Sequence, residues 1–379
     1  LCMKFVLIPD SFKGTLSSTQ ICEIVTGRIE KHFPGSEIVS IPVADGGEGS
    51  VDAFITAVGG EKISKKVKNP YFEDMDSYYG LIENGQTAVI EMASCAGLPL
   101  VEGREDPSRT TTYGVGQLMM AAVGRGVKRI IVGLGGSSTN DGACGAAAAC
   151  GAKFFDADQR EFVPVGGTLS DIKNIDLSGM NQALKNVEIV AMCDIDNPMY
   201  GPTGAAYIFG PQKGADEKMV SELDQGLVNL AGVIEETIGK DISQIPGSGA
   251  AGAMGAGMIA FWSAGLQMGI QTVLDTVNFD DLISDADYII TGEGKLDSQS
   301  LRGKVVIGIA GRAKKQKKHV IAVVGGADDN EIGEVYDMGV TAVFPINRLP
   351  LDFSVSRKQS KENLAYTVDN ILRLIKADV

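Results

Sequence analysis

Short apolar runs alternate with amphipathic stretches near both ends of the chain. Five runs rich in β-branched residues predict buried parallel strands, at residues 4–8, 37–41, 288–291, 320–324 and 342–345. An apolar pattern of helical period follows each run, at residues 17–32, 48–58, 300–315, 331–338 and 358–375. This alternation is typical of a parallel sheet with helices on both faces.

The alternation is interrupted once, after the second helix. The intervening residues predict strands at 62–68, 78–83, 88–93, 128–132 and 188–192, and helices at 113–124, 143–149, 217–238 and 254–269. We therefore expect an α/β fold. A discontinuous flavodoxin-like, doubly wound parallel-sheet domain spans residues 1–60 and 286–379, and a second α/β domain, residues 61–285, is inserted into it. The strand order 2-1-3-4-5 would bring residues 9–13 beside residues 292–297.

The net charge disfavours some partners. A formal charge of −14 and a pI near 4.7 argue against a nucleic-acid partner, which would need clustered Lys and Arg. An anionic small substrate would instead need a local positive pocket. No apolar run approaches the roughly 18 residues of a membrane span, and the first residues carry no leader pattern. We expect no membrane partner and a cytoplasmic location.

The cysteines and histidines of the chain limit the kinds of catalytic and metal site that it can form. The 6 cysteines include no CxxC pair, and four lie in apolar or alanine-rich surroundings, which favours reduced, buried thiols. The chain has only 2 histidines, so His-dependent triads and multi-His metal sites are not expected.

Three polar segments follow predicted strands. "PDSFKGTLSS" contains Asp10 and Lys13, and "VADGGEGS" contains Asp45. "GEGKLDSQSLRGK" adds four more candidates, which are Glu293, Asp297, Arg302 and Lys304. Phosphoryl transfer uses this mixture, with carboxylates for Mg²⁺ and the hydroxyl proton and with cations for phosphate oxygens. Helix capping is the alternative, and it is the commoner role for any single residue of this kind.

Two glycine-rich segments are candidate anion sites. The turn "GLGGSSTNDG" precedes an alanine-rich helix, and we expect unpaired N–H groups there to favour an anion; its candidates are Gly135, Gly136, Ser137, Ser138, Thr139 and Asn140. In "GSGAAGAMGAG", Gly249 and Gly252 belong to a formal GxGxxG that lacks the preceding strand and acidic residue of a dinucleotide fingerprint. Phosphate binding and close helix packing explain its glycines equally well.

Asp194 and Asp196 leave the predicted strand 188–192 within "MCDIDNP". Acidic side chains at a strand end suit Mg²⁺ or a substrate hydroxyl. A turn role is the alternative, and for Asp196 it is the favoured one.

Seven segments, taken in order, resemble the glycerate kinase family of bacterial glyoxylate and sugar-acid pathways. They are "PDSFKGTLSS", "DGGEGSVDAF", "TTTYGVGQLM", "GLGGSSTNDG", "CDIDNPMYGPTGAAYIFGPQKGA", "GSGAAGAMGAGM" and "TGEGKLDSQSLRGK". The resemblance implies ATP-dependent phosphorylation of D-glycerate, and a flavodoxin-like domain interrupted by a swivelling-type α/β domain. Ala143 stands where the family more often has glycine, and Val305-Val306 replaces a proline-containing pair, so loop geometry is in question at both places.

The roles of individual residues are physical inferences. Asp194 is the first candidate for Mg²⁺ ligation or general base, with Asp45 and Asp10 as alternates. Lys13, Arg302 and Lys304 are expected to meet the carboxylate of glycerate or the transferred phosphate. The turn 135–140 is expected to bind ATP phosphates or glycerate in a cleft between the domains.

The expected product is 2-phosphoglycerate, with 3-phosphoglycerate possible. Three other functions stay open at this point: a nucleotide-linked oxidoreductase of a small hydroxy acid, a kinase of another small sugar acid, and a non-catalytic binding module.

Overall fold

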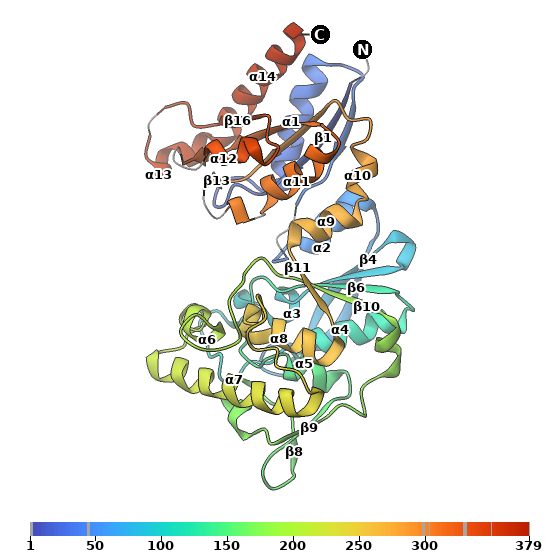
Figure 1. Cartoon of the computed structure of the whole chain (residues 1–379), viewed down its shortest axis with the longest axis vertical. Coiled ribbons are helices and arrows are strands. Elements are labelled where there is room, and N and C mark those ends of the chain that lie inside the picture. Colours follow the sequence, from blue (N-terminus) through green and yellow to red (C-terminus); the bar gives the residue numbers. More distant parts are fainter. Residues whose placement is uncertain are drawn as a thin grey trace. The chain divides into compact units, whose positions relative to one another are not determined.

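The computed structural model describes residues 3–43, 46–297, 300–302, 304–328, 332–349 and 351–378. The chain forms two compact units (Figure 1). The first comprises Leu1–Ala44, Thr56–Val58 and Ile270–Val379, and the second comprises Asp45–Ile55 and Gly59–Gly269. Each unit has its own sheet and its own hydrophobic core.

The sheet of the first unit has five parallel strands. Their order is β16 (Ala342–Pro345), β14 (His319–Val324), β12 (Tyr288–Gly292), β1 (Lys4–Pro9) and β2 (Glu37–Ser40). All five strands predicted from the apolar runs are confirmed, and so is the predicted strand order.

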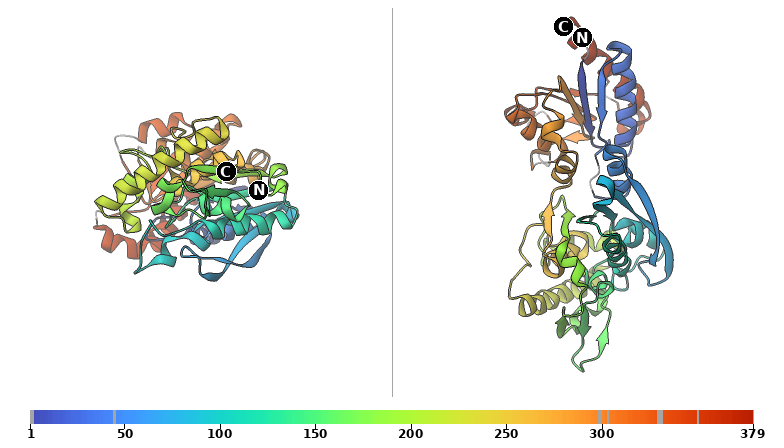
Figure 2. Two further views of the ribbon diagram at one scale, coloured as in Figure 1. Left: turned by 90° about the horizontal axis from the view of Figure 1, so that it is seen from below. Right: turned by 90° about the vertical axis from the view of Figure 1, so that its right-hand side faces the viewer.

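Helices cover both faces of this sheet because successive residues of a buried strand point to opposite sides. Phe5 and Leu7 of β1 pack in one core with α1 (Ser18–His32) and α14 (Ser360–Asp378), which lie side by side in Figures 1 and 2. Val6 and Ile8 are buried on the other face, where α11 (Val305–Lys315) contacts β12 and β14. The unit is therefore doubly wound.

The units differ from the predicted domains on both sides of the insertion. Asp45–Ile55, predicted in the first domain, belong to the second unit, and residues 270–285, predicted in the insertion, belong to the first unit. Part of residues 270–285 is helical, in α9 (Gly269–Thr276) and α10 (Phe279–Leu282). Arg312 of α11 explains why these residues join the first unit, because its guanidinium lies 2.6 Å from Asp275 and 2.6 Å from Asp280. These are tertiary ion pairs, and the periodicity of the chain carries no sign of them.

The sheet of the second unit has six strands. Their order is β11 (Gly265–Gln267), β10 (Glu188–Met192), β6 (Arg129–Gly133), β5 (Thr87–Glu91), β4 (Asp74–Ile82) and β3 (Glu61–Lys68). The first four strands are parallel, whereas β4 is antiparallel to both of its neighbours. The carboxyl ends of four strands therefore meet at one edge.

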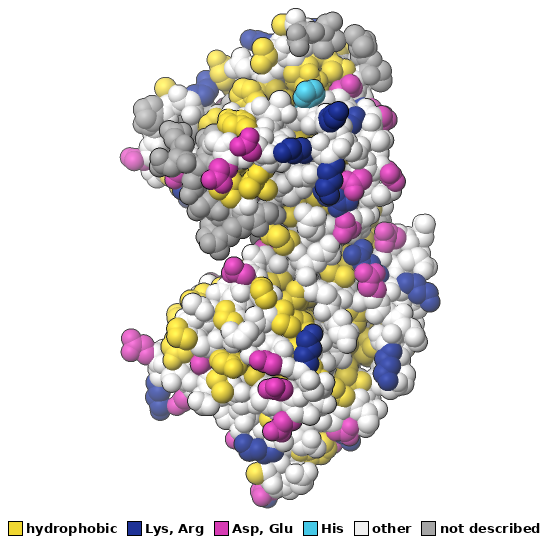
Figure 3. Space-filling model, viewed as in Figure 1, with side chains coloured by type: hydrophobic (Ala, Val, Ile, Leu, Met, Phe, Trp, Pro, Cys, Tyr) yellow, Lys and Arg dark blue, Asp and Glu magenta, His cyan; other side chains and the backbone are white. Residues whose placement is uncertain are grey.

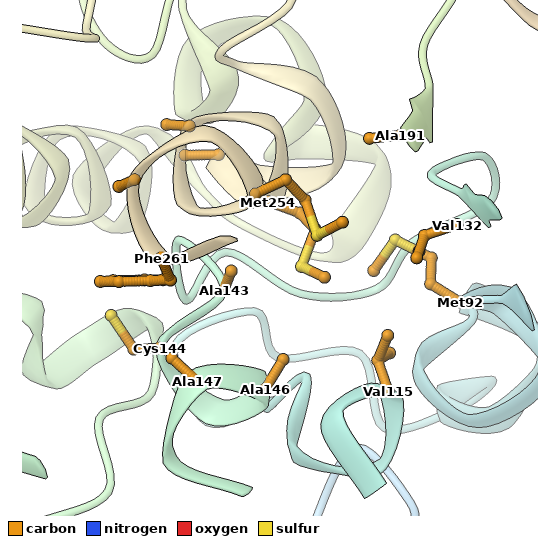
Figure 4. Close-up of a cluster of buried hydrophobic side chains, with 14 of the residues drawn as sticks. Met92, Val115, Val132, Ala143, Cys144, Ala146, Ala147, Ala191, Met254 and Phe261 are labelled. Atoms are coloured by element: carbon orange, nitrogen blue, oxygen red, sulfur yellow. The ribbon is translucent and has the colours of Figure 1, made fainter. Parts of the chain in front are cut away.

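Small residues let the helices of this unit pack closely. Its larger helices are α4 (Tyr113–Gly124), α5 (Cys144–Ala149), α7 (Glu217–Ile238) and α8 (Ala250–Trp262). A Cβ on Gly257 of α8 would collide with the Cβ of Ala143, next to α5. Figure 4 shows Ala143 between Met254, Phe261 and Cys144 in the shared core.

The predicted helix 254–269 is wrong in its second half. The helix ends at Trp262, and Ser263 adopts a left-handed φ of 52°. Residues Gly265–Gln267 then pair with β10 as the parallel strand β11. A strand of three residues is too short to show a period of two in the sequence.

The remaining elements are short. They are α2 (Ser50–Val58), α3 (Ala93–Ala96), α6 (Ala205–Phe209), α12 (Ile332–Asp337), α13 (Phe353–Ser356), β7 (Lys153–Phe155), β8 (Glu161–Phe162), β9 (Asn174–Asp176), β13 (Lys295–Leu296) and β15 (Gly326–Ala327). The small sheet of β7, β8 and β9 projects from the second unit in Figures 1 and 2.

The cysteines, the surface charges and the helices of the structure can be compared with what the composition predicts. Five cysteines of the described chain are free and buried, as predicted: Cys22, Cys95, Cys144, Cys150 and Cys193. Figure 3 shows Lys and Arg interspersed with Asp and Glu on the face in view, without a large basic patch there. Among the described residues, no helix has the length and apolar character needed to cross a membrane.

Candidate functional site

The first pocket lies within the first unit, beyond the carboxyl ends of β1 and β12. Pro9 pairs with Gly292 in the parallel register, so Asp10 and Glu293 leave the sheet side by side. The cavity holds about 580 Å³. Its lining includes Asp10, Ser11, Phe12, Lys13, Glu293, Lys295, Asp297, Lys304, Ile346, Phe353 and Arg357. This is the switch-point location predicted from the strand order.

Backbone contacts hold the two strand ends together. The Asp10 N–H donates to the carbonyl of Gly292 at 2.9 Å, and the Ser11 N–H donates to Oδ1 of Asp10 at 2.6 Å. Gly292 lies against the carbonyl of Val323, where a Cβ would collide. A larger residue would therefore push the end of β12, which carries Glu293, away from β14.

Glu293 is a buried carboxyl group of this pocket, and its pKa is shifted. Its side chain is buried, with 6% of the residue exposed, and Oε1 has no hydrogen-bond partner among the described residues. The pKa of Glu293 is raised to about 7, mainly by burial and also by the nearby charges of Asp10 and Asp297. The Ser300 hydroxyl and the Lys304 ammonium act in the opposite direction. Near neutral pH this carboxyl can hold or release a proton.

Cations surround the same cavity. Lys13, Lys304 and Arg357 line it, and the Lys295 ammonium lies 3.7 Å from the carboxylate of Asp297 at a largely exposed position. The side chain of Arg302, which follows in the 3₁₀ turn Ser300–Arg302, lies outside the described part of the structure. The pocket therefore presents both signs of charge, as phosphoryl transfer needs.

The described residues include no cluster of three or more His, Cys, Asp or Glu side chains that could hold a metal ion. Mg²⁺ seldom requires one, since it is usually bound through one or two carboxylates plus substrate phosphates and water. The partnerless Oε1 of Glu293, beside Asp10, is consistent with such a partial ligand set.

The second pocket lies within the second unit, where the carboxyl ends of its parallel strands meet. Gly133 pairs with Met192 on one side and with Glu91 on the other. The cavity holds about 220 Å³ and is lined by Leu134, Gly135, Gly136, Ser137, Met192, Cys193, Asp194, Ile195, Phe209, Gln212, Lys213, Ala250 and Ala251.

The expectation of outward, unpaired N–H groups in the turn 135–140 is wrong for Gly135 and Ser138. The Gly135 N–H donates to the carbonyl of Gly46, and the Ser138 N–H donates to the carbonyl of Ala96. Ser138, Thr139 and Asn140 are buried. Neighbouring loops supply these acceptors, so only residues 135–137 of the turn line the cavity.

At the N-terminus of α5, side chains of the protein accept the hydrogen bonds of the backbone N–H groups. The carboxylate of Asp141 accepts from the N–H of Thr112 at 2.7 Å and from the N–H of Gly145 at 3.2 Å. The Thr112 hydroxyl accepts from the N–H of Ala146 at 3.0 Å. These caps leave that helix end no role in holding an external anion.

Close packing accounts for Gly249 and Gly252. A Cβ on Gly249 would collide with the carbonyl of Pro198, and one on Gly252 with the carbonyl of Thr139. Residues 240–246 form no strand, so the segment is not a dinucleotide fingerprint. The neighbouring Ala250 and Ala251 line the second pocket, and phosphate binding by the two glycines stays a prediction.

The remaining aspartate candidates differ in position. Asp194 follows β10, is exposed in the second pocket, and accepts from the N–H of Gly269 at 2.7 Å through Oδ1. Asp45 lies outside the described residues.

Sequence reasoning missed Lys213 of the second pocket. Lys213 is 2% exposed, and its ammonium donates a hydrogen bond to the carbonyl of Thr139 at 2.6 Å. Burial lowers its pKa to about 7, although the charge of Asp141 acts the other way. Lys213 was in view within the quoted segment "GPQKGA", but nothing in its local pattern distinguishes a buried lysine from an exposed one.

The candidates thus form two groups, each within one unit. The first pocket contains Asp10, Lys13, Glu293, Asp297 and Lys304. The second contains Gly135, Gly136, Ser137 and Asp194. Both lie beyond the carboxyl ends of parallel strands, where α/β proteins bind small ligands.

The fold and these pockets define the class, an α/β protein with polar ligand sites at its strand ends. The chain belongs to the glycerate kinase family, whose model matches residues 5–376. A glycerate kinase of Bacillus cereus is 43% identical over 375 residues, which cover 99% of this chain and 98% of that protein. A glycerate 2-kinase of Escherichia coli is 44% identical over 345 residues, which cover 91% and 90%.

A solved structure has the same fold. The crystal structure of a candidate glycerate kinase 2 from Salmonella typhimurium LT2 matches with a TM-score of 0.87 and 37% identity, covering 100% of this chain and 99% of that one.

Proposed function

We propose that this protein transfers the γ-phosphate of ATP to a hydroxyl group of D-glycerate, with 2-phosphoglycerate as the favoured product. Family membership over residues 5–376 supports the reaction class. The observation that carries the proposal at the level of chemistry is the first pocket. There the buried carboxyl of Glu293, whose Oε1 has no partner among the described residues, lies among Asp10, Lys13 and Lys304.

In this proposal the first pocket binds ATP. Its cavity of about 580 Å³ is in the range of ligand sites for drug-sized molecules. Phe12, Ile346 and Phe353 supply apolar surface for the base. Lys13 and Lys304 would neutralise phosphate oxygens, which develop charge during transfer.

Mg²⁺ would accompany ATP in the same pocket. Asp10 and Glu293 would hold the ion together with the phosphates, and the ion would stabilise charge on the transferred group. A bound cation favours the ionised form of a carboxyl group. The raised pKa of Glu293 is therefore compatible with a metal role, because Mg²⁺ would offset the cost of ionising a buried group.

The second pocket would bind glycerate. Its cavity of about 220 Å³ suits a compact acid better than a nucleotide. Asp194 is the proposed general base, because its carboxylate is exposed to that cavity and can accept the proton of the attacking hydroxyl. The N–H of Gly269 orients the carboxylate through Oδ1.

The variant Asp194→Asn tests this role. Because Asn keeps an acceptor oxygen for the Gly269 N–H, the fold should survive, while kcat falls by roughly a hundredfold or more. Asp196→Asn is the matched control, since Asp196 is also exposed but does not line the cavity. Steady-state ADP release with D-glycerate measures both variants, and near-normal turnover of Asp194→Asn would remove Asp194 from the mechanism.

A further inference from the structure

Lys213 occupies an unusual position for a lysine. It ends the 3₁₀ turn Pro211–Lys213 and is 2% exposed, and its ammonium lies 2.6 Å from the carbonyl oxygen of Thr139. Lysine is rarely buried to this degree unless it is paired, because removing an ammonium from water is costly. A peptide carbonyl is a neutral partner and offsets only part of that cost. The same side chain lines the second pocket.

Polar atoms beside Lys213 also lack partners. Within the described part of the chain, Oγ1 of Thr139, both amide atoms of Asn140 and Oδ1 of Asp141 are buried without a hydrogen bond. Native proteins leave few such atoms, and those that remain call for an explanation. A bound ligand that brings a polar group or water into this region would supply one.

The backbone on another side of the pocket is strained. Ala251, Gly252 and Ala253 adopt φ values of 54°, 66° and 65°. Left-handed geometry is costly for alanine, and such strain concentrates at ligand sites. Ala250 and Ala251 line the same cavity as Lys213. Two independent features therefore meet at one small pocket, a buried cation and a strained turn. The partnerless polar atoms belong to residues next to Lys213 that do not themselves line the cavity.

We propose that Lys213 binds the carboxylate of the small hydroxy acid in the second pocket. This inference rests on the proposed function and names the group that would recognise the acid end of the substrate. A carboxylate carries the single negative charge that matches one ammonium, and the cavity suits a compact acid. A phosphate of ATP has related chemistry and is the alternative that the test separates.

The titration of Lys213 makes the proposal sensitive to pH. Its pKa is about 7 in the free protein, where the charge of Asp141 partly offsets the effect of burial. Asp194 lines the same cavity. Above pH 7 the free lysine loses its proton, whereas a bound carboxylate favours the ammonium form. Glycerate binding should therefore weaken as pH rises above 7, and binding at pH 8 should take up close to one proton.

The variant Lys213→Met retains most of the length of the side chain and removes the charge. The KM for D-glycerate should rise roughly ten- to hundredfold, as expected for the loss of a charge-assisted contact, while the KM for ATP stays within about twofold. Lys218→Met is the matched control, because Lys218 is 85% exposed at its side chain and lies five residues away. Its KM values should match those of the unaltered protein.

The other outcomes overturn the proposal. A KM that rises for ATP and not for glycerate would assign Lys213 to phosphate, and two unchanged KM values would remove it from binding. If the unaltered protein forms no ADP with glycerate, the proposed function fails, which is a different result from an active enzyme that is indifferent to Lys213→Met.

If Lys213→Met does not fold, calorimetry of the unaltered protein tests the same proposal. D-Glycerate is titrated at pH 8 in two buffers of different ionisation enthalpy. Uptake of close to one proton supports the proposal, whereas binding without proton uptake contradicts it.

Discussion

Ala143 is a residue whose conformation suits glycine better. It adopts φ 67° and ψ 8° at the start of α5, and its methyl group packs against Gly257 in the core. The resemblance to the family suggested a glycine at this place, and the left-handed geometry gives the physical reason. An L-residue pays about 1–2 kcal/mol for this conformation.

We predict that Ala143→Gly raises the free energy of unfolding by about 0.5–1 kcal/mol. Relief of the backbone strain should exceed the added entropy of glycine in the unfolded chain. Urea denaturation measures the change. Ala146→Gly, within α5, is the control and should lower the free energy of unfolding by about 1 kcal/mol or more. Equal losses in both variants would show that the conformation of Ala143 is not strained.

Glu293 should make stability depend on pH. Its pKa is raised from 4.5 to about 7 in the folded protein, so between these values the folded state holds a proton that the unfolded state has released. The free energy of unfolding should therefore fall as pH rises from about 4.5 to about 7, by on the order of 3 kcal/mol for this group alone.

The variant Glu293→Gln should abolish that fall and be more stable than the unaltered protein at pH 8, while losing activity. Thermal unfolding between pH 4.5 and 8 measures it. Glu362→Gln, at an exposed position of α14, is the control and should keep the original pH profile. An unchanged profile in Glu293→Gln would mean that Glu293 titrates near its ordinary pKa.

At the scale of single residues, the sequence predicts which side chains lie close together when their proximity follows from the order of the strands. Asp10 and Glu293 follow adjacent strands, so their proximity could be expected from the alternation of strands and helices. The burial of Asn140 and Lys213 could not, because it depends on loops from other elements that cover them. The sequence alone does not show whether a polar residue is exposed to solvent or buried.

At the element scale, α2 shows how a helix end depends on a distant strand. Its first N–H groups lie within "DGGEGSVDAF". Glu91 of β5 accepts from the N–H of Gly49 at 3.0 Å and from that of Val51 at 2.8 Å. Glu91 is fully buried. The sequence predicts the helix, but a cap supplied from another element leaves no local signal.

We predict that Glu91→Gln lowers the free energy of unfolding by about 1–3 kcal/mol. The amide can accept only through its oxygen, so one helix N–H loses its acceptor in a buried setting. Chemical denaturation measures the loss. Glu61→Gln on β3, where the side chain is exposed, should change stability by less than about 0.5 kcal/mol. A loss as small as that control would show that water can replace the cap.

Most helices and strands can be predicted from the local sequence, and the exceptions share one cause. The predicted bounds of α4, α7, β10 and β16 are those observed. Residues 265–267 form a strand because β10 offers them a parallel edge, and residues 270–282 join the first unit through Arg312. Both outcomes depend on tertiary partners, which outweigh local preference.

At the scale of the whole molecule, an acidic protein is proposed to bind two anionic substrates. The net charge of −14 opposes that binding, so the cations must be concentrated locally. Lys13 and Lys304 line the first pocket, and Lys213 lines the second. The polar strand ends predicted the location of the first pocket, whereas the buried cation of the second became visible only in the folded chain.

The central claim is that ATP phosphorylates D-glycerate at O2, and ³¹P NMR of a reaction containing the protein, Mg²⁺, ATP and D-glycerate tests it most directly. The account predicts conversion of ATP to ADP with a new phosphomonoester signal that is split into a doublet by the single proton on C2. A triplet would place the phosphate on the primary hydroxyl and contradict the preferred product. An unchanged ATP spectrum would contradict the proposed function itself.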